Sequence, residues 1–319
     1  MISEMKQAGC TQVDIARALG RSPSTVSREI KAGTNARGYY IASTAHRTAQ
    51  ARARRPKPAK LANCERLRDA VQKWLRKNWS PKQISQALVL EFPDEPEMRV
   101  SHETIYLSLY IQARGGLKRE LVTHLRTSRS LRKGHRVPGE RRGRIPNMVN
   151  ISERPPEVAD RAVPGHWEGD LIMGANNRSA IGTLVERHTR FVMLLHLPDG
   201  HSAEYVNAAM AAKIRELPDA LVRSITWDQG TELSQHAQFT VDTGVQVYFC
   251  DPHSPWQRGS NENTNGLLRQ YFPKGTDLSV HSEERLRFVA DELNERIRET
   301  LDWDTPAERL NRLIVATTA

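Results

Sequence analysis

Three acidic residues stand where the surrounding sequence could bring them together. Asp170 lies inside the apolar run "HWEGDLIMG", Asp228 ends the run "ITWD" just before a glycine turn, and Glu262 lies near the start of a predicted helix. Carboxylates that converge repel one another and shift one another's pKa values, so such a cluster usually holds hard cations. Two Mg²⁺ ions about 3.5 to 4 Å apart suit phosphodiester chemistry, because one activates the attacking oxygen and the other stabilises the leaving one.

Two other acids compete for these roles. Glu168 shares a strand face with Asp170, about 6.6 to 6.8 Å away, and Glu232 follows Asp228 by four residues. All of these residues could also be solvent-facing acids among the 37 in the chain. If the first three acids hold the metals, Glu168→Gln and Glu232→Gln should keep substantial activity.

The predicted helix at residues 261–271 favours Glu262 as the third acid. In "SPWQRGSNENTNGLLRQYFPKG", Glu262, Asn265 and Arg269 share one helix face with a glycine, whereas the large apolar side chains point elsewhere. An acid, an amide, a glycine and an arginine on one face suit a DNA backbone that approaches a metal. The predicted DNA contacts beside the metals are Arg258, Asn265 and Arg269, while His253 and Trp256 either shape the preceding loop or pack structurally.

The acids depend on strands and helices that begin near residue 164. The runs at 166–174, 179–190 and 191–200 are successive strands with turn residues between them, which favours an antiparallel meander. There follow a helix at 202–217, a strand at 221–230, a short helix at 234–239, a strand at 245–251 and helices at 261–271 and 283–300. The prediction is an α/β fold: a mixed five-stranded sheet with helices on its faces, in which the first and fourth strands can lie side by side.

The N-terminal segment "TQVDIARALGRSPSTVSREIKAG" predicts two short helices joined by a tight glycine turn. Thr11 and Asp14 have capping-box spacing. The second helix begins at Ser22 with Pro23 in its first position. This is the layout of a helix-turn-helix, although an ordinary helical hairpin has the same spacing. The residues predicted to face a DNA groove are Ser24, Thr25, Ser27 and Arg28.

A similar pattern recurs between Leu67 and Tyr110, and we interpret it as a second all-α helix-turn-helix. The expected organisation is a first helix-turn-helix module at 1–48, a basic linker at 49–60, a second helical module at 61–125, a basic flexible linker at 126–160 and a catalytic core at 161–319.

Charge is divided unevenly between the halves of the chain. Residues 1–150 contain 30 Lys and Arg against 12 Asp and Glu, a net +18, and residues 151–319 contain 17 against 25, a net −8. This split indicates a basic part that binds a polyanion, although a solvated basic surface is the alternative. Three distant cysteines offer neither a disulfide framework nor a Cys-x-x-Cys zinc site. No secretory signal or membrane span is expected.

The run from Asp251 to Gly275, "DPHSPWQRGSNENTNGLLRQYFPKG", together with "HWEGDLI" and "WDQGTE", resembles the DDE transposases of the bacterial insertion-sequence family thirty. The segment "LGRSPSTVSREI" is similar to the first helix-turn-helix of that family, and the 33 residues between Asp228 and Glu262 match the spacing of its acidic triad. The resemblance covers nearly the whole chain. It implies an RNase H-like, integrase-type core in which Asp170, Asp228 and Glu262 are the catalytic, metal-binding residues.

The resemblance further implies a transposase that binds the terminal inverted repeats of its element, cuts a strand with a metal-activated water and joins the freed 3′-hydroxyl to target DNA. The corresponding expectations are two Mg²⁺ ions per site, for which Mn²⁺ substitutes, a homo-oligomer of at least two protomers on DNA, and a cytoplasmic, nucleoid-associated location. A DNA-binding regulator or inactive remnant is the alternative. A structural nucleoid protein would show no sequence preference.

One segment departs from the family pattern. Relatives tend to read "NxRPRKxLGWxTP" near the C-terminus, whereas this chain reads "NERIRETLDWDTP". Ile297, Glu299 and Asp302 therefore replace a proline, a lysine and a glycine. If this segment touches DNA, the loss of one cation and the gain of two anions would weaken the contact.

Overall fold

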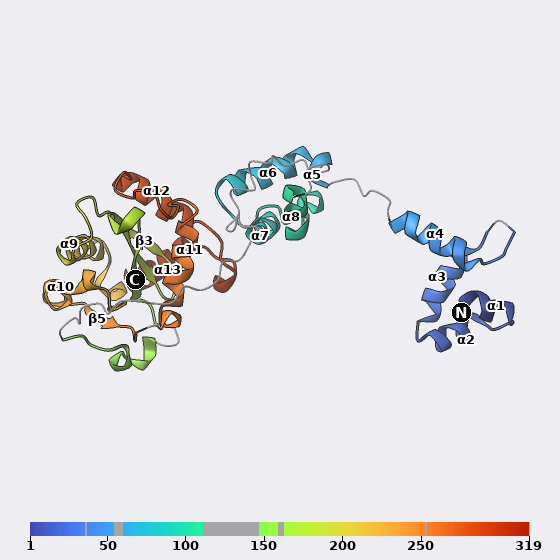
Figure 1. The fold of residues 1–319 in the computed structure, drawn as a ribbon, viewed down its shortest axis with the longest axis horizontal. Coiled ribbons are helices and arrows are strands. Elements are labelled where there is room, and N and C mark those ends of the chain that lie inside the picture. The colour runs from blue at the N-terminus through green and yellow to red at the C-terminus, as the bar shows by residue number, and fades with distance from the viewer. Residues whose placement is uncertain (36, 54–59, 111–146, 159–162, 253, 319) are drawn as a thin grey trace. The chain divides into compact units, whose positions relative to one another are not determined.

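The computed structural model describes the chain except for residues 36, 54–59, 111–146, 159–162, 253 and 319 (Figure 1). The described residues form two compact units, Met1–Ala59 and Lys60–Ala319. Residues 111–125 of the predicted second module, and residues 126–146 and 159–160 of the flexible linker predicted at 126–160, lie outside the described residues. The finer division into five segments stays a prediction.

The first unit is helical, as predicted. The side chains of Thr11 and Asp14 form a reciprocal capping box at the start of its second helix. At the start of the third, the Ser22 side chain accepts a hydrogen bond from the backbone N–H of Thr25. Gly20 ends the second helix with φ 60°, a left-handed conformation that glycine adopts without steric cost. The helices are α1 (Ile2–Gln7), α2 (Gln12–Leu19), α3 (Pro23–Gly33) and α4 (Ala42–Ala53), with a core of Ile15, Ala16, Val26 and Ile30.

The first linker, predicted at residues 49–60, overlaps the end of a helix. Helix α4 continues through residues 49–53 and ends at Ala53. Its sequence, "ASTAHRTAQARA", is rich in alanine and contains neither glycine nor proline, so helix propensity is high throughout.

The second unit opens with another helical region, in which two helices begin with side-chain caps, as α2 and α3 do. A capping box of Ser80 and Gln83 begins one of them, and the Ser101 side chain accepts from the N–H of Thr104 at the start of the next. Each of these two helices buries an isoleucine, Ile84 in the first and Ile105 in the second. In the first unit, α2 and α3 likewise bury Ile15 and Val26. The elements are α5 (Lys60–Asn63), α6 (Glu65–Arg76), α7 (Pro81–Glu91), the 3₁₀ helix η1 (Pro96–Met98) and α8 (His102–Tyr110).

The segment that departs from the family pattern packs against this helical region. Ile297 is 7% exposed and belongs to the same apolar cluster as Trp79. Gln83 Nε2 donates to the Ile297 carbonyl oxygen at 2.7 Å, and Lys82 Nζ lies 2.6 Å from the Glu299 carboxylate. Ile297 and Glu299 therefore make contacts within the chain that explain a large apolar side chain and an acid at these positions.

The third departure, Asp302, follows the 3₁₀ helix η9 (Glu299–Leu301) with φ 55°. A glycine would adopt this left-handed conformation freely, and aspartate is one of the few other residues that tolerate it. The Asp302 carboxylate lies 3.3 Å from Arg309 Nη2, so its charge is also partnered within the chain.

Replacing Ile297 by alanine should lower the free energy of unfolding by about 2 to 4 kcal/mol, because the change removes a buried aliphatic side chain and leaves a cavity. Chemical denaturation of the full chain measures the loss. Val280→Ala is the matched control, since Val280 is 73% exposed and should change stability little. Equal effects of the two substitutions would show that the C-terminal segment does not pack on the helical region.

The catalytic-core region forms the five-stranded mixed sheet that the sequence predicts. Its order is β3-β2-β1-β4-β5, with antiparallel pairing among the first three strands along the chain and parallel pairing of β1 with β4 and β4 with β5. The predicted neighbourhood of the first and fourth strands is confirmed. The strands are β1 (His166–Met173), β2 (Ala180–Glu186), β3 (Val192–Leu195), β4 (Ser224–Trp227) and β5 (Gln246–Phe249).

Helices cover both faces of the sheet (Figure 1). On one face, α9 (Ala203–Ile214) and α10 (His236–Thr243) pack on an apolar cluster that includes Trp167 and Trp227. On the other face, α11 (Gly259–Leu268) and α12 (Glu283–Asn294) pack on a cluster that includes Ile172. Because side chains alternate along β1, Glu168 and Asp170 belong to the face of α11. Helix α13 (Pro306–Thr318) ends the chain, and the remaining 3₁₀ segments are η3 (Ile151–Glu153), η4 (Pro156–Val158), η5 (Ala175–Asn177), η6 (Asp219–Leu221), η7 (Thr231–Leu233) and η8 (Pro255–Arg258).

Two predicted boundaries of this region are wrong. Residues 147–158 were expected to be linker, yet the Phe249 N–H donates to the Val149 carbonyl at 2.9 Å and Val158 is buried, so this stretch covers the β5 edge of the sheet. The helix predicted at 283–300 ends at Asn294, whose side chain bonds both backbone groups of Val192 on β3. These tertiary contacts override the local helical pattern. Among the described residues, every helix is too short or too polar to span a membrane.

Candidate active site

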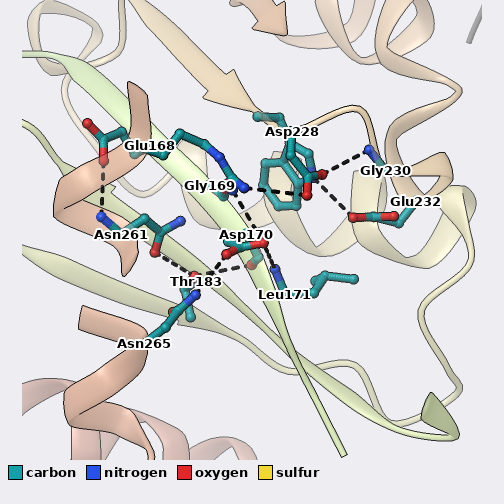
Figure 2. Close-up of polar contacts among 12 residues, drawn as sticks. Glu168, Gly169, Asp170, Leu171, Thr183, Asp228, Gly230, Glu232, Asn261 and Asn265 are labelled. Atoms are coloured by element: carbon teal, nitrogen blue, oxygen red, sulfur yellow. Dashed lines mark hydrogen bonds and ion pairs between the residues drawn. The ribbon is translucent and has the colours of Figure 1, made fainter. Parts of the chain in front are cut away.

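Strands β1 and β4 bring Asp170 and Asp228 together (Figure 2). The strands are parallel neighbours in which Glu168 pairs with Thr226, and an aspartate follows two residues later on each. Asp170 is therefore part of β1, and Asp228 follows the last residue of β4 at the matching level. The strand predicted at 221–230 is present but ends at Trp227, so Asp228 lies directly after its end.

Gly169 allows this close approach. A Cβ atom at Gly169 would lie 2.0 Å from a ring carbon of Trp227, far inside van der Waals contact. Trp227 is fully buried and immediately precedes Asp228. The indole thus packs directly over the glycine backbone, and this contact fixes the end of β4 against the middle of β1.

Arg258 bridges the two aspartates. Its Nη1 lies 3.3 Å from Asp170 Oδ1 and its Nη2 lies 3.4 Å from Asp228 Oδ2. Nη1 also donates to the Gly169 carbonyl oxygen at 2.9 Å. All three charged side chains are largely shielded, with 13%, 24% and 31% exposure for Arg258, Asp170 and Asp228. One guanidinium thereby offsets two neighbouring carboxylates.

Amide donors fix the orientation of both carboxylates (Figure 2). Asp170 accepts from the Leu171 backbone N–H at 2.9 Å and from Asn265 Nδ2 at 2.8 Å. Asp228 accepts from the Gly230 backbone N–H at 2.9 Å, within the turn that follows β4. The glycine turn in "WDQG" therefore positions the aspartate that precedes it.

Burial raises the pKa of the Asp170 carboxyl above its ordinary value; the Arg258 guanidinium opposes the rise and the Asp228 carboxylate adds to it. Burial by itself lowers the pKa of Arg258, but its neighbours, Asp170 and Asp228 foremost, leave the pKa above its ordinary value. Both effects follow from placing like charges close together in a partly dry site. A cation of higher charge between the carboxylates would be favoured for the same reason.

Glu262 lies in the first turn of α11, on the helix that also carries Asn265, and its side chain is exposed. The predicted convergence of three carboxylates is not seen: among the described residues, no three His, Cys, Asp or Glu side chains form a group that could hold a metal ion. Without a multivalent cation a third carboxylate gains nothing by approaching two others, and Arg258 already offsets that pair.

The residues nevertheless fit a divalent cation. The donors are carboxylate oxygens, the ligands that Mg²⁺ and Mn²⁺ prefer, and a side-chain cation already lies between two of them. Asn265 Oδ1 is buried and has no hydrogen-bond partner among the described residues, so it is an additional oxygen beside Asp170.

A cavity of about 680 Å³ opens beside the aspartates. Asp170, Asp228 and Glu232 line it together with Arg178, His201 and Tyr205. Glu232 is half-buried, and Trp227 Nε1 donates to it at 3.4 Å. Glu232 is therefore a stronger competitor for the third metal-binding position than its sequence spacing suggested, and a substitution must decide between it and Glu262.

Glu168, which the sequence suggested as a competitor on the strand face of Asp170, is fully buried. One carboxylate oxygen accepts from Arg187 Nη1 at 2.5 Å, and the other accepts from the backbone N–H groups of Ser260 and Asn261, both at 3.0 Å. Figure 2 shows the bond between Glu168 and Asn261. The sequence signal is an acid within a largely apolar strand, and this signal does not identify the partners of Glu168.

The other predicted contacts differ in their surroundings. Arg269 donates to the carbonyl oxygens of Met173 and Phe272, at 3.0 and 3.3 Å, and burial lowers its pKa. His253 and the side chain of Trp256 lie outside the described residues. In the first unit, Val26 and Ile30 of α3 are buried. The side chains of this helix that were predicted to face DNA are all exposed: Ser24, Thr25, Ser27 and Arg28.

Comparisons with known proteins agree with this architecture. The integrase core domain family matches residues 160–255, and a helix-turn-helix domain family matches residues 1–33. The transposase for insertion sequence element IS1086 of Cupriavidus metallidurans is 51% identical over 302 residues, which cover 94% of this chain and 88% of the relative. Transposase InsI for insertion sequence element IS30C of Escherichia coli is 48% identical over 308 residues, 95% of this chain and 79% of the relative. Among solved structures, the catalytic core domain of BIV integrase aligns with TM-score 0.38 and 18% identity over 49% of this chain and 99% of that one.

Proposed function

The chain belongs to the IS30 family of insertion-sequence transposases, and from that premise we propose that Asp170, Asp228 and Glu262 hold the catalytic metal ions for cutting and joining DNA. The protein is a DNA-binding transposase with an integrase-type core, a class of enzyme that depends on divalent metal ions. The observation that carries the proposal is the pair of aspartates on adjacent strands with one side-chain cation between them. The helix that carries Glu262 contributes Asn265 to the same pair.

The proposed reaction is hydrolysis at the end of the element followed by attack of the freed 3′-hydroxyl on target DNA. Two Mg²⁺ ions, replaceable by Mn²⁺, would activate the attacking oxygen and stabilise the leaving oxygen. Asp170 and Asp228 would bind these ions on the side of the sheet, and Glu262 would bind them from α11. Asn265 keeps Asp170 in one orientation throughout, since it donates to the carboxylate oxygen that Arg258 does not contact.

DNA contacts beside the metals are proposed for Arg258, Asn265 and Arg269. With metal ions bound, Arg258 would no longer be needed to offset the two aspartates, and its guanidinium would suit a backbone phosphate. Arg269 uses two of its five N–H donors on carbonyl oxygens, which leaves others for a phosphate.

Recognition of the terminal inverted repeats is assigned to the two helical regions, with α3 as the reading helix of the first. In the second, we propose α8 as the counterpart of α3, because the Ser101 side chain caps it as Ser22 caps α3. We also propose that at least two protomers assemble on DNA, because two ends must be joined, and that the protein acts at the bacterial nucleoid, where its substrate lies.

Binding of the full chain to terminal-repeat duplexes should weaken steeply as salt rises, because phosphate contacts release counterions. Arg28→Ala should lower discrimination between the repeat and unrelated DNA by about 1 to 3 kcal/mol if Arg28 reads a base. A uniform loss on all duplexes would instead place Arg28 on a phosphate. Fluorescence anisotropy at several salt concentrations measures both, and equal affinity of the unsubstituted protein for unrelated duplexes would contradict end recognition.

Metal-dependent cutting of a terminal-repeat duplex tests the proposal as a whole. Cleavage and joining with Mg²⁺ or Mn²⁺, absent in chelator, are the expected results. Sequence-specific binding without any cutting would instead identify a regulator or an inactive remnant.

A further inference from the structure

The N-terminus of helix α11 is capped by a side chain from another element. The first backbone N–H groups of a helix have no partner within it and are normally satisfied by a side chain at the preceding position. That position in α11 is Arg258, whose side chain makes no such bond. Glu168 on β1 supplies it instead, with one oxygen that accepts from Ser260 and Asn261.

The bond is fixed at both ends. Glu168 is completely buried, and its second oxygen is bound by Arg187, which is 4% exposed. Asn261 is also fully buried, and its side-chain oxygen accepts from Thr183 Oγ1 at 2.9 Å on the neighbouring strand β2. The carboxylate therefore cannot swing away from the helix without losing a buried ion pair.

The same strand also holds the next turn of the helix. Asp170, two residues after Glu168 on the same face of β1, accepts from Asn265 Nδ2 at 2.8 Å. Glu262 lies between these two attachments, immediately after the backbone N–H that Glu168 binds. Strand β1 thus carries one proposed metal-binding carboxylate and also sets the position of the helix that carries another.

We propose that Glu168 is a positioning residue of the active site: it registers α11 on β1 so that Glu262 faces the aspartate pair. This inference rests on the proposed function. It reverses the prediction that Glu168→Gln keeps substantial activity. A glutamine has only one acceptor oxygen, so it cannot accept from Arg187 and from the helix N-terminus together. Its NH₂ group would face either the Arg187 guanidinium or the helix amides, and both are also donors.

The first experiment measures the helix directly. Hydrogen exchange of the full-length protein is followed in peptides from residues 259–268. In Glu168→Gln the amides at the start of α11 should exchange about five- to tenfold faster than in the unsubstituted protein, the effect of losing a helix cap. Glu186→Gln is the matched control: Glu186 is a fully buried carboxylate of β2 that binds Gly165 and Thr189 rather than α11. Equal exchange of α11 in both variants would overturn the proposal.

The second experiment separates positioning from general destabilisation. Mn²⁺ binding to the full chain is measured by titration calorimetry in Glu168→Gln, Glu262→Gln and the double variant. If Glu168 acts through Glu262, Glu168→Gln as a single substitution should weaken Mn²⁺ binding. In a protein that already carries Glu262→Gln, the same substitution should cause no further loss of Mn²⁺ affinity. Additive losses, or no loss in Glu168→Gln, would overturn the inference.

Glu168→Asp provides a variant that keeps the buried charge if the glutamine variant does not fold. The shorter side chain keeps a carboxylate for Arg187 but draws back from the helix amides, so faster exchange in α11 and weaker Mn²⁺ binding are again expected. Unchanged exchange in this variant would contradict the proposal. A Glu262→Gln variant with normal cleavage and Mn²⁺ binding would instead refute Glu262 as the third ligand, while the exchange result would still report on α11.

Discussion

Replacing Glu262 by glutamine should abolish strand cleavage while the protein still binds terminal-repeat DNA. Glutamine keeps the shape of the side chain but removes the anion, so a site that neutralises divalent cations loses part of its ligand charge. A loss of about 3 kcal/mol or more in transition-state stabilisation corresponds to a cleavage rate lower by at least about a hundredfold. The measurement is cleavage and joining on a terminal-repeat duplex with Mg²⁺ or Mn²⁺, alongside binding to the same DNA.

Asp170→Asn and Asp228→Asn should be equally inactive, because both carboxylates belong to the pair that Arg258 bridges. The matched control is Glu232→Gln, which removes a carboxylate from the wall of the same cavity. Substantial cleavage by this variant supports Glu262 as the third acid. An inactive Glu232→Gln together with an active Glu262→Gln would transfer the role to Glu232.

Gly169→Ala should destroy the active site without any change of charge. The added Cβ would lie 2.0 Å from the buried Trp227 ring, so the ring or the β1 backbone must move. Overpacking of this severity costs about 3 kcal/mol or more in the free energy of unfolding. Because Trp227 immediately precedes Asp228, movement of the ring should also displace Asp228. The fraction of the Gly169→Ala variant that folds should therefore cleave DNA slowly.

Gly259→Ala is the control for Gly169→Ala, since no atom of the described residues, apart from the adjacent residues and the backbone of its own helix, lies within 4 Å of the corresponding Cβ position at Gly259. Gly259 is the first residue of α11, where alanine is a better helix former than glycine. Thermal unfolding and cleavage should therefore change little in this variant. A Gly169→Ala protein with normal stability and activity would show that Trp227 does not pack on β1 as described.

The sheet and the aspartate pair were predictable because their signals are local. Three apolar runs with turns between them indicate a meander, and an apolar run that stops at Asp228 before a glycine marks the end of a strand. The capped starts of α2 and α3 are likewise encoded within four residues of Thr11 and Ser22. Periodicity and capping rules describe interactions of this range.

The contacts of Glu168, Arg258 and Ile297 were not predictable because their partners are distant in sequence. Ser260 lies 92 residues from Glu168, and Ile297 lies 214 residues from Gln83. An acid in a strand has the same local pattern whether it meets solvent or the N-terminus of a helix. Only the packing of α11 on β1 and β2 decides between these cases.

The position of Arg258 affects the stability of the protein in the absence of metal ions. Two partly buried aspartates that repelled each other would oppose folding, yet the guanidinium between them supplies an internal counter-charge. We therefore expect the chain to fold without any cofactor, unlike small zinc domains, which unfold when a chelator removes the metal. This arrangement separates folding from catalytic competence: chelation should switch the enzyme off reversibly and leave it folded.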